Sequence, residues 1–353
     1  MQLRANPFRG AATPFPVEAE IPEPSVRSDR PLELLAKCPA YAATPLLDCA
    51  DLASRLGVAA VHVKDERGRM GLGSFKALGA AYVIAQDAMA CRPDAIDQAL
   101  RGQTYVTASA GNHGLSVAAG ARVFGARAVV YIAETVPDAF AVRLRAKGAQ
   151  VVRAGAIYED SMEAAARAAR DKGWKLLSDS SWPGYTDRPH RLMEGYLVLM
   201  AEVFEAIPVP PSHIVLQAGV GGLAAACAAI ARREWGDGPR IVVVEPEAAP
   251  ALDGAIAAGR FVRVDGPASA MGRLDCKEAS RIALKGLARD ADAFALISEA
   301  EAQQAVARLA DMGLASTPSG VAGLAAILSG DADALGLGPD ARVLAILSEG
   351  AAA

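Results

Sequence analysis

The segment Gly71-Leu72-Gly73-Ser74-Phe75-Lys76-Ala77-Leu78-Gly79-Ala80 places one lysine among glycines and small apolar residues, at the predicted start of a helix. Burial disfavours a charged ammonium, so we expect the pKa of Lys76 to fall and its amine to become a nucleophile. An amine of this kind can bind a carbonyl cofactor as a Schiff base. A solvated lysine at an ordinary helix start is the alternative interpretation.

A second glycine-rich segment, Gln217-Ala218-Gly219-Val220-Gly221-Gly222-Leu223, follows an apolar run and precedes a predicted helix over 224–232. Its backbone N–H groups can converge on a phosphate at the helix N-terminus. The loop also fits a dinucleotide site, because Ala224 completes a Gly-x-Gly-x-x-Ala pattern and Glu245 follows about 20 residues later. A tight turn that serves only packing is a third interpretation. No other segment of the sequence supports hydride transfer.

A third segment, Thr107-Ala108-Ser109-Ala110-Gly111-Asn112-His113-Gly114, lies between a predicted strand and a predicted helix over 115–124. A loop that opens a helix offers free N–H donors to a carboxylate, and the Asn112 amide can donate to a phenolate oxygen. As plain structure the segment is a helix N-cap, and His113 is expected to bond to backbone.

Taken in the order lysine, asparagine loop, glycine loop, these segments resemble fold-type II, or tryptophan synthase β-like, pyridoxal phosphate enzymes. Further segments are similar to the diaminopropionate ammonia-lyase family, and the likeness runs from about Tyr41 to the last residues. Threonine and serine dehydratases share the first three segments but lack the Asp-x-x-Trp-x-Gly-Tyr pattern. The segments that carry the narrower resemblance are Lys64-Asp65-Glu66, Asp179-Ser180-Ser181-Trp182-Pro183-Gly184-Tyr185-Thr186, Met193-x-Gly195-Tyr196, Met271-Gly272-Arg273-Leu274-Asp275-Cys276 and Leu347-Ser348-Glu349-Gly350.

The resemblance implies how pyridoxal 5′-phosphate is held. Lys76 would carry the cofactor as a Schiff base, Asn112 would bond its phenolic oxygen, and Ser348 would face the pyridine nitrogen. The backbone of Gly219, Val220, Gly221 and Gly222 would hold the phosphate. A hydroxyl cannot protonate the ring as a carboxylate would, which favours elimination of a β leaving group over transamination. A strand-end hydroxyl bonded to backbone is the alternative for Ser348.

The implied reaction is β-elimination from a small amino acid, with 2,3-diaminopropionate yielding pyruvate and ammonia. Lys76 and Asp179 are the two candidate bases for the α-proton, and Asp179 could also bind the cation of the leaving amine. A solvated loop acid is the alternative for Asp179. We expect the substrate to lie against the asparagine loop, at Ser109, Ala110, Gly111, Asn112 and His113.

Two positions depart from the family pattern. Ala110 stands where these lyases commonly have an aspartate before Gly-Asn-His-Gly, and Lys277 stands where a glycine is expected. Because both positions are expected near the substrate, a threonine, serine or 3-hydroxyaspartate dehydratase is the alternative enzyme. A non-catalytic protein that binds pyridoxal phosphate is the alternative from another class.

Composition limits the other possibilities. The chain has 353 residues, 52% of them hydrophobic, and a formal net charge of −4 with no basic blocks, so a nucleic-acid partner is not expected. No apolar run reaches the ~18 residues of a membrane span. Five scattered cysteines disfavour disulfides and zinc, and Cys276 is expected to be an inert buried thiol. We expect no metal, and a cytoplasmic homodimer of amino-acid catabolism.

Short β-branched runs alternate with helical patterns from Tyr105 onward, which predicts an α/β protein with parallel-rich sheets. The length of the chain predicts two lobes, and the resemblance to fold-type II enzymes implies a three-layer fold. The resemblance places a small domain at 84–180 and a large cofactor-binding domain at 1–83 and 181–353. Residues 1–40 are rich in proline and predict an extended arm over the body, of a kind that often meets a second subunit.

Overall fold

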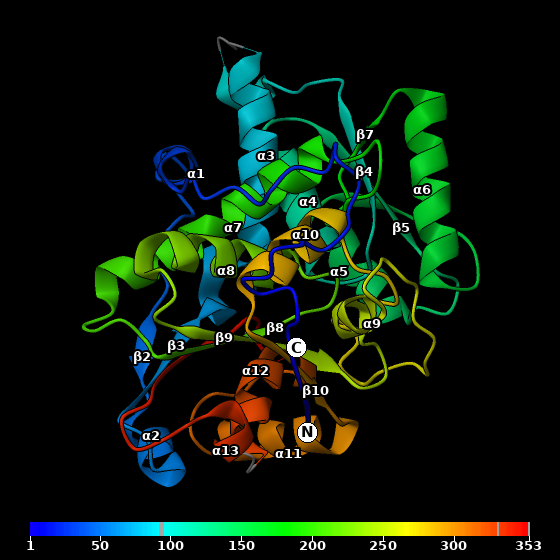
Figure 1. Cartoon of the computed structure of the whole chain (residues 1–353). Helices are drawn as coiled ribbons and strands as arrows, with labels where there is room; N and C mark the ends of the chain where they lie inside the picture. The colour runs from blue at the N-terminus through cyan, green and yellow to red at the C-terminus, as the bar shows by residue number, and fades with distance from the viewer. Residues whose placement is uncertain (92–94, 330–331, 352–353) are drawn as a thin grey trace.

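The smaller of two β-sheets is built from the alternating segment that the sequence predicts. The structure is a computed structural model that describes residues 1–91, 95–329 and 332–351. Four strands pair in the order β6-β5-β4-β7, all parallel. Helices α4, α5 and α6 each connect one strand to the next along the chain (Figure 1). Their bounds are β4 Thr104–Ala108, α4 Asn112–Val123, β5 Arg127–Ile132, α5 Asp138–Ala146, β6 Ala149–Arg153, α6 Tyr158–Lys172 and β7 Lys175–Leu176.

The larger sheet has seven strands in the order β1-β10-β9-β8-β11-β3-β2. Its five inner strands are parallel, and the two edge strands, β1 and β2, pair antiparallel with their neighbours. The bounds are β1 Gln2–Ala5, β2 Leu46–Asp48, β3 Ala60–Asp65, β8 His213–Gln217, β9 Arg240–Pro246, β10 Ala293–Ile297 and β11 Arg342–Leu347. This arrangement confirms the predicted α/β class with parallel-rich sheets.

Side chains that alternate along the inner strands divide the apolar core between the two faces of the larger sheet. Ile214 and Leu216 of β8 belong to a core that includes residues of α3, α7, α8, α9 and α10, whereas Val215 belongs to a core that includes residues of α2, α11 and α12. The first of these cores also includes the inner face of the smaller sheet, so it joins the two sheets. The helix bounds are α1 Asp29–Leu35, α2 Ala50–Leu56, α3 Lys76–Ala90, α7 Asp187–Ala206, α8 Gly222–Trp235, α9 Ala251–Ala258, α10 Arg281–Asp290, α11 Glu299–Ala310, α12 Pro318–Leu328 and α13 Ala332–Leu335, with 3-10 turns at Glu66–Gly71 and Ile96–Gln98.

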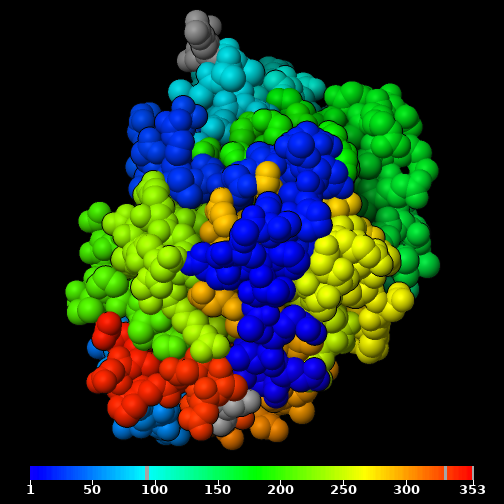
Figure 2. Space-filling model, in the orientation of Figure 1, coloured from blue at the N-terminus to red at the C-terminus, as the bar shows by residue number. Residues whose placement is uncertain are grey.

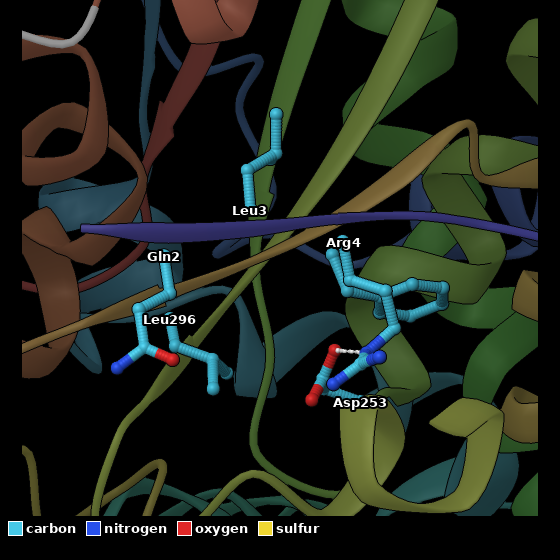
Figure 3. A pocket seen from close by; sticks show the side chains of 6 residues that line it. Gln2, Leu3, Arg4, Asp253 and Leu296 are labelled. Atoms are coloured by element: carbon cyan, nitrogen blue, oxygen red, sulfur yellow. Dashed lines mark hydrogen bonds and ion pairs between the residues drawn. The ribbon is translucent and has the colours of Figure 1, made fainter. Parts of the chain in front are cut away.

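The proline-rich residues 1–40 cross the surface of the body, as Figure 2 shows for the dark-blue chain. They are more regular than an extended arm, because β1 joins the edge of the larger sheet and Asp29–Leu35 forms α1. Beside β1 lies a cavity of about 200 Å³ where Arg4 Nε donates to Asp253 Oδ1 at 2.7 Å (Figure 3). The division into domains at 84–180 remains a prediction, and no helix within the described residues is long and apolar enough to cross a membrane.

A buried network of charged side chains fixes the chain just before the lysine segment. The Lys64 ammonium lies 2.6 Å from Glu202 Oε2, and the Arg69 guanidinium bonds both Glu202 and Glu66 at 2.7 Å. All four side chains are buried, so the charges compensate one another away from water. Glu66 and Arg69 belong to the 3-10 turn Glu66–Gly71, so the network holds the segment that leads to α3.

Helix α3, which starts at Lys76, crosses α7 at a contact between two glycines. A Cβ on Gly195 would lie 2.8 Å from the Leu78 carbonyl oxygen and 2.9 Å from Gly79 Cα. Real Cβ atoms do not approach backbone so closely, so only glycine lets the two helices meet here. The next residue of α7, Tyr196, packs edge-on against Phe75 with ring centroids 5.0 Å apart.

We predict that Gly195→Ala lowers the free energy of unfolding by about 1–3 kcal/mol, because the added methyl group forces α3 and α7 apart. Gly338→Ala is the matched control, since a Cβ there meets no atom within 4 Å. Urea unfolding of both variants measures the effect. Equal stability of the two variants would contradict the close helix contact.

Candidate active site

Five loops that follow strands bring the sequence-predicted residues to one place. Lys76 opens α3 beyond β3, Asn112 opens α4 after β4, and Asp179 follows β7. The glycine loop follows β8 and Ser348 follows β11. The site therefore lies at the carboxyl ends of parallel strands from both sheets, where open α/β sheets bind ligands.

Lys76 and Asp179 form an ion pair between the Lys76 ammonium and Asp179 Oδ2. The side chains retain only 21% and 18% of their exposure, so both charges are largely removed from water. Lys76 Nζ also lies 5.2 Å and 5.9 Å from the ring centroids of Phe75 and Tyr196. The lysine thus has the apolar surroundings that the sequence predicts, together with one carboxylate partner.

The expectation that the pKa of Lys76 falls is wrong. Burial lowers the pKa of the ammonium, but the nearby Asp179 carboxylate more than offsets burial and the net pKa is raised. For Asp179, burial raises the pKa, and the Lys76 ammonium outweighs it, so the carboxyl pKa is held well below its ordinary value. The resemblance placed Asp179 at the site, but the expected fall in pKa considered only the apolar neighbours of Lys76 and not an ion pair with this carboxylate, which lies 103 residues further along the chain.

Asp179 is held by the turn that follows it. Trp182 and Tyr185 stack with ring centroids 4.4 Å apart, and the Tyr185 hydroxyl donates to the Leu176 carbonyl at 2.9 Å. Ser181 Oγ lies 2.7 Å from Ser280 Oγ, and the Ser280 N–H donates to the Val220 carbonyl at 3.0 Å. The Asp179 segment is thereby tied to the smaller sheet at one end and to the glycine loop at the other.

The glycine loop fits a phosphate group. It opens α8, a helix of 14 residues, whose first N–H groups have no acceptor within the helix. Gly221 has φ +95°, which side-chain-bearing residues rarely adopt, and a Cβ on Gly219 would lie 3.0 Å from Cys276 Sγ. A Cβ on Gly222 would lie 3.9 Å from the Asp179 carbonyl oxygen, so this backbone is adjacent to the lysine pair.

The asparagine loop meets a carboxylate that the sequence analysis did not assign. Asn112 Nδ2 donates to Glu349 Oε2, and Glu349 also accepts from Thr317 and pairs with Arg273 Nε at 2.8 Å. Burial raises the pKa of Glu349, and the Arg273 charge opposes that shift. Asn112 therefore lies at the site with its amide held from one side.

The other predicted residues of the asparagine loop stand at the same end of β4. The Gly111 N–H donates to Ser109 Oγ at 3.3 Å, and Ala110 is partly buried between them. The buried His113 ring places Nε2 2.8 Å from the Leu177 carbonyl oxygen, which is the backbone contact that we expected. Burial lowers the pKa of His113, so a neutral ring is favoured near Lys76 and Asp179.

Ser348 is buried at the end of β11, and its carbonyl oxygen accepts from the Phe75 N–H at 3.2 Å. This contact places Ser348 directly beside the lysine segment. Burial, with the Asp179 charge, raises the pKa of Cys276 to about 12. The thiol therefore stays protonated, as an inert thiol does.

Of the two departures from the family pattern, Lys277 bonds to neighbouring loop residues. Its ammonium lies 2.7 Å from Asp275 Oδ1 and donates to the carbonyl oxygens of Ala248 and Pro267 at 2.7 and 2.9 Å. Ala110 leaves a methyl group at the asparagine loop. Across the residues that the structure describes, no group of three or more histidine, cysteine or acidic side chains could hold a metal ion.

Sequence reasoning missed Tyr196, Ser280 and Glu349 as parts of this site. Their contacts are made with residues more than 95 positions away along the chain. The one available signal was that Tyr196 and Glu349 lie inside segments that resemble the family. Ser280 lies in no such segment.

Comparisons with known proteins agree on one group. Residues 38–349 match the model of the family described as pyridoxal-phosphate dependent enzyme. A diaminopropionate ammonia-lyase of Escherichia coli is 32% identical over 87% of this chain and 79% of its own length. One of Salmonella typhimurium is 36% identical over 61% of this chain, and the match spans 58% of that relative's length.

A solved structure agrees with these matches. The crystal structure of the Escherichia coli diaminopropionate ammonia-lyase in complex with an aminoacrylate–PLP azomethine reaction intermediate has a TM-score of 0.86 and 28% identity. It covers 99% of this chain and 93% of that chain.

We predict that Asp179→Asn lowers the pKa of Lys76, because burial then acts on the ammonium without its partner. In protein freed of bound small molecules, the pH midpoint for acetylation of Lys76 should fall by about 1–3 pH units. Competitive acetylation with isotope-labelled anhydride, followed by peptide mass spectrometry, measures it. Asp187→Asn, at an exposed carboxylate, is the control. An unchanged midpoint in Asp179→Asn would rule out the pair as the dominant influence on Lys76.

Proposed function

Because this chain belongs to the pyridoxal-phosphate dependent enzyme family, with that cofactor, we propose that it is an ammonia-lyase acting on a small β-substituted amino acid. The most favoured substrate is 2,3-diaminopropionate, which gives pyruvate and two ammonia molecules. The observation that carries the proposal is the pairing of Lys76 with Asp179 beside the glycine loop. This pairing combines an amine for the cofactor with an acid–base group for the substrate.

The residues present fit the cofactor. Lys76 would bind its aldehyde carbon, Asn112 its phenolic oxygen, and the backbone of 219–222 its phosphate. Ser348 would face the pyridine nitrogen. When bound, pyridoxal phosphate withdraws electrons from the α-carbon of the amino acid, so that the α-proton becomes acidic.

The protein supplies the groups that move protons and hold the substrate. Lys76 and Asp179 are the candidates that accept the α-proton, since both are largely buried at the same point. Asp179 already pairs with one ammonium, that of Lys76, so its carboxylate suits it to bind the ammonium at the β-carbon. The substrate carboxylate would lie against the asparagine loop, from Ser109 to His113. The N–H groups of Ser109 and Gly111 donate to the Tyr131 carbonyl and to Ser109 Oγ, so those of Ala110, Asn112 and His113 would bind the carboxylate.

Ser348 favours elimination over transamination. A hydroxyl leaves the pyridine nitrogen without a proton donor as strong as a carboxylic acid, so negative charge at the α-carbon is less delocalised. A less stabilised charge expels the β substituent sooner. The place of Ser348 beside the lysine segment supports this role.

Ala110 favours one second candidate, dehydration of serine, threonine or 3-hydroxyaspartate. The loop lacks the carboxylate that diaminopropionate ammonia-lyases commonly carry there. A substrate with an uncharged hydroxyl group at the β-carbon would therefore lose less binding energy than one with an ammonium group.

We also propose that the enzyme is a cytoplasmic homodimer of amino-acid catabolism. The surface course of residues 1–40 supports a subunit contact, and the five free cysteines suit a reducing compartment.

We predict that the protein releases two ammonia molecules per 2-oxo acid from 2,3-diaminopropionate and acts more slowly on serine and threonine. Measuring 2-oxo acid and ammonia separately over a panel of β-substituted amino acids tests this. Lys76→Ala should abolish both products, whereas Lys172→Ala, at an exposed lysine, should retain them. One ammonia per 2-oxo acid, with serine or threonine preferred, would favour the dehydratase. No product from any substrate would favour the non-catalytic protein.

We predict that the enzyme prefers one enantiomer of 2,3-diaminopropionate, the L form. The α-protons of the two enantiomers project from opposite faces of the bound substrate, and Ala110 provides no base on its face. Ala110→Asp should therefore raise the rate on the D form by about 10² or more, the scale of a positioned base. Equal initial rates of the parent on both forms would refute the assignment, as would an Ala110→Asp enzyme with unchanged selectivity. Ala110→Asn is the uncharged control.

A further inference from the structure

Glu349 is a buried carboxylate at the site that the proposed reaction does not use. It follows Ser348 at the end of β11 and is only 4% exposed. Its neighbours come from three separate elements: Asn112 from the start of α4, Thr317 from the N-cap of α12, and Arg273 from the loop packed against Gly219. A buried carboxylate is costly unless its oxygens are bonded, so this arrangement requires a reason.

Three neighbours, Thr317, Asn112 and Arg273, contact the two oxygens of Glu349, which together offer about four acceptor positions. Oε1 accepts from the Thr317 hydroxyl, which also accepts from the Gly320 N–H at 3.0 Å. Oε2 accepts from Asn112 and lies 2.8 Å from Arg273 Nε. Glu349 is therefore built to hold neighbouring side chains in place.

The side chain that gains most is Asn112. An asparagine amide has a donating and an accepting end of nearly equal shape, and its neighbours decide which way it faces. A carboxylate accepts hydrogen bonds only, so Glu349 fixes Nδ2 as the end that faces it. The Asn112 amide is planar and has two N–H bonds. When Glu349 holds the first N–H, the direction of the second is fixed as well.

We propose that Glu349 is a positioning residue that orients the Asn112 amide, so that the second N–H donates to the phenolic oxygen of pyridoxal phosphate. This inference rests on the proposed role of Asn112 in binding the cofactor. It does not depend on which amino acid is the substrate.

The test compares four variants of the full chain: Glu349→Gln, which removes the charge, Glu349→Asp, which keeps the charge but withdraws it from Asn112, Asn112→Ala, and the double variant Glu349→Gln/Asn112→Ala. Glu205→Gln, at an exposed carboxylate, is the control. We expect each single site variant to bind pyridoxal phosphate about tenfold more weakly, the scale of one lost hydrogen bond to a charged oxygen. The double variant should bind no more weakly than Asn112→Ala alone. Effects that multiply would overturn the proposal.

A spectroscopic readout separates positioning from mere structural support. An N–H donor draws negative charge from the phenolic oxygen, so losing the donor leaves the adjoining nitrogen of the bound cofactor easier to protonate. The pH midpoint of the visible absorbance change should therefore rise in Glu349→Asp and in Asn112→Ala. Glu349→Gln also loses the charge, so it is compared by cofactor binding only. Loss of the Glu349 charge alone would lower the midpoint instead.

Several results would overturn the proposal: an unchanged or lowered midpoint in Glu349→Asp, parent-like cofactor binding in both Glu349 variants, or an Asn112→Ala protein whose binding is unchanged. Because Glu349→Asp keeps the charge among Thr317 and Arg273, it provides the test if Glu349→Gln does not fold. Product measurements on diaminopropionate are made separately, so failure of the proposed reaction and failure of this inference are distinguishable.

Discussion

The ion pair between Lys76 and Asp179 is the contact on which the rest of the site depends. It joins α3, beside the larger sheet, to the segment that follows the last strand of the smaller sheet. The Ser181–Ser280–Val220 contacts then bind that segment to the glycine loop. One pair of opposite charges thus sets the relation between the lysine, the acid and the phosphate-binding backbone.

Two kinds of buried charge serve different ends in this protein. One kind is a network in which two positive and two negative charges balance, made by Lys64, Glu66, Arg69 and Glu202. All four side chains are buried, and each has a partner of opposite charge. At the site, in contrast, Lys76 has a single carboxylate partner and keeps some exposure. A fully satisfied network rigidifies the approach to the lysine, whereas a pair with few partners can exchange them for a ligand.

Local sequence patterns predicted most of the fold. The predicted helix over 115–124 overlaps α4, which begins three residues earlier, and the predicted helix over 224–232 lies inside α8, because hydrophobic periodicity and glycine turns are properties of short segments. Patterns of this kind cannot show which distant side chains meet. The raised pKa of Lys76, the Glu349 bonds to Asn112 and the serine link to Val220 all depend on such meetings. The many prolines of residues 1–40 predicted an extended arm, so the strand β1 and the helix α1 within it were not predicted.

The position of β11 determines the order in which the chain can acquire its structure. This strand lies in the interior of the larger sheet, between β8 and β3, although it comes after all the others in sequence. During synthesis β3 therefore has to wait for residues 342–347 before it gains its inner neighbour, while the smaller sheet is complete once residue 176 has emerged. Non-local pairing of this kind slows folding and exposes apolar strands in the meantime. The contiguous smaller sheet can thus form co-translationally, ahead of the larger sheet, whose strands flank it in sequence.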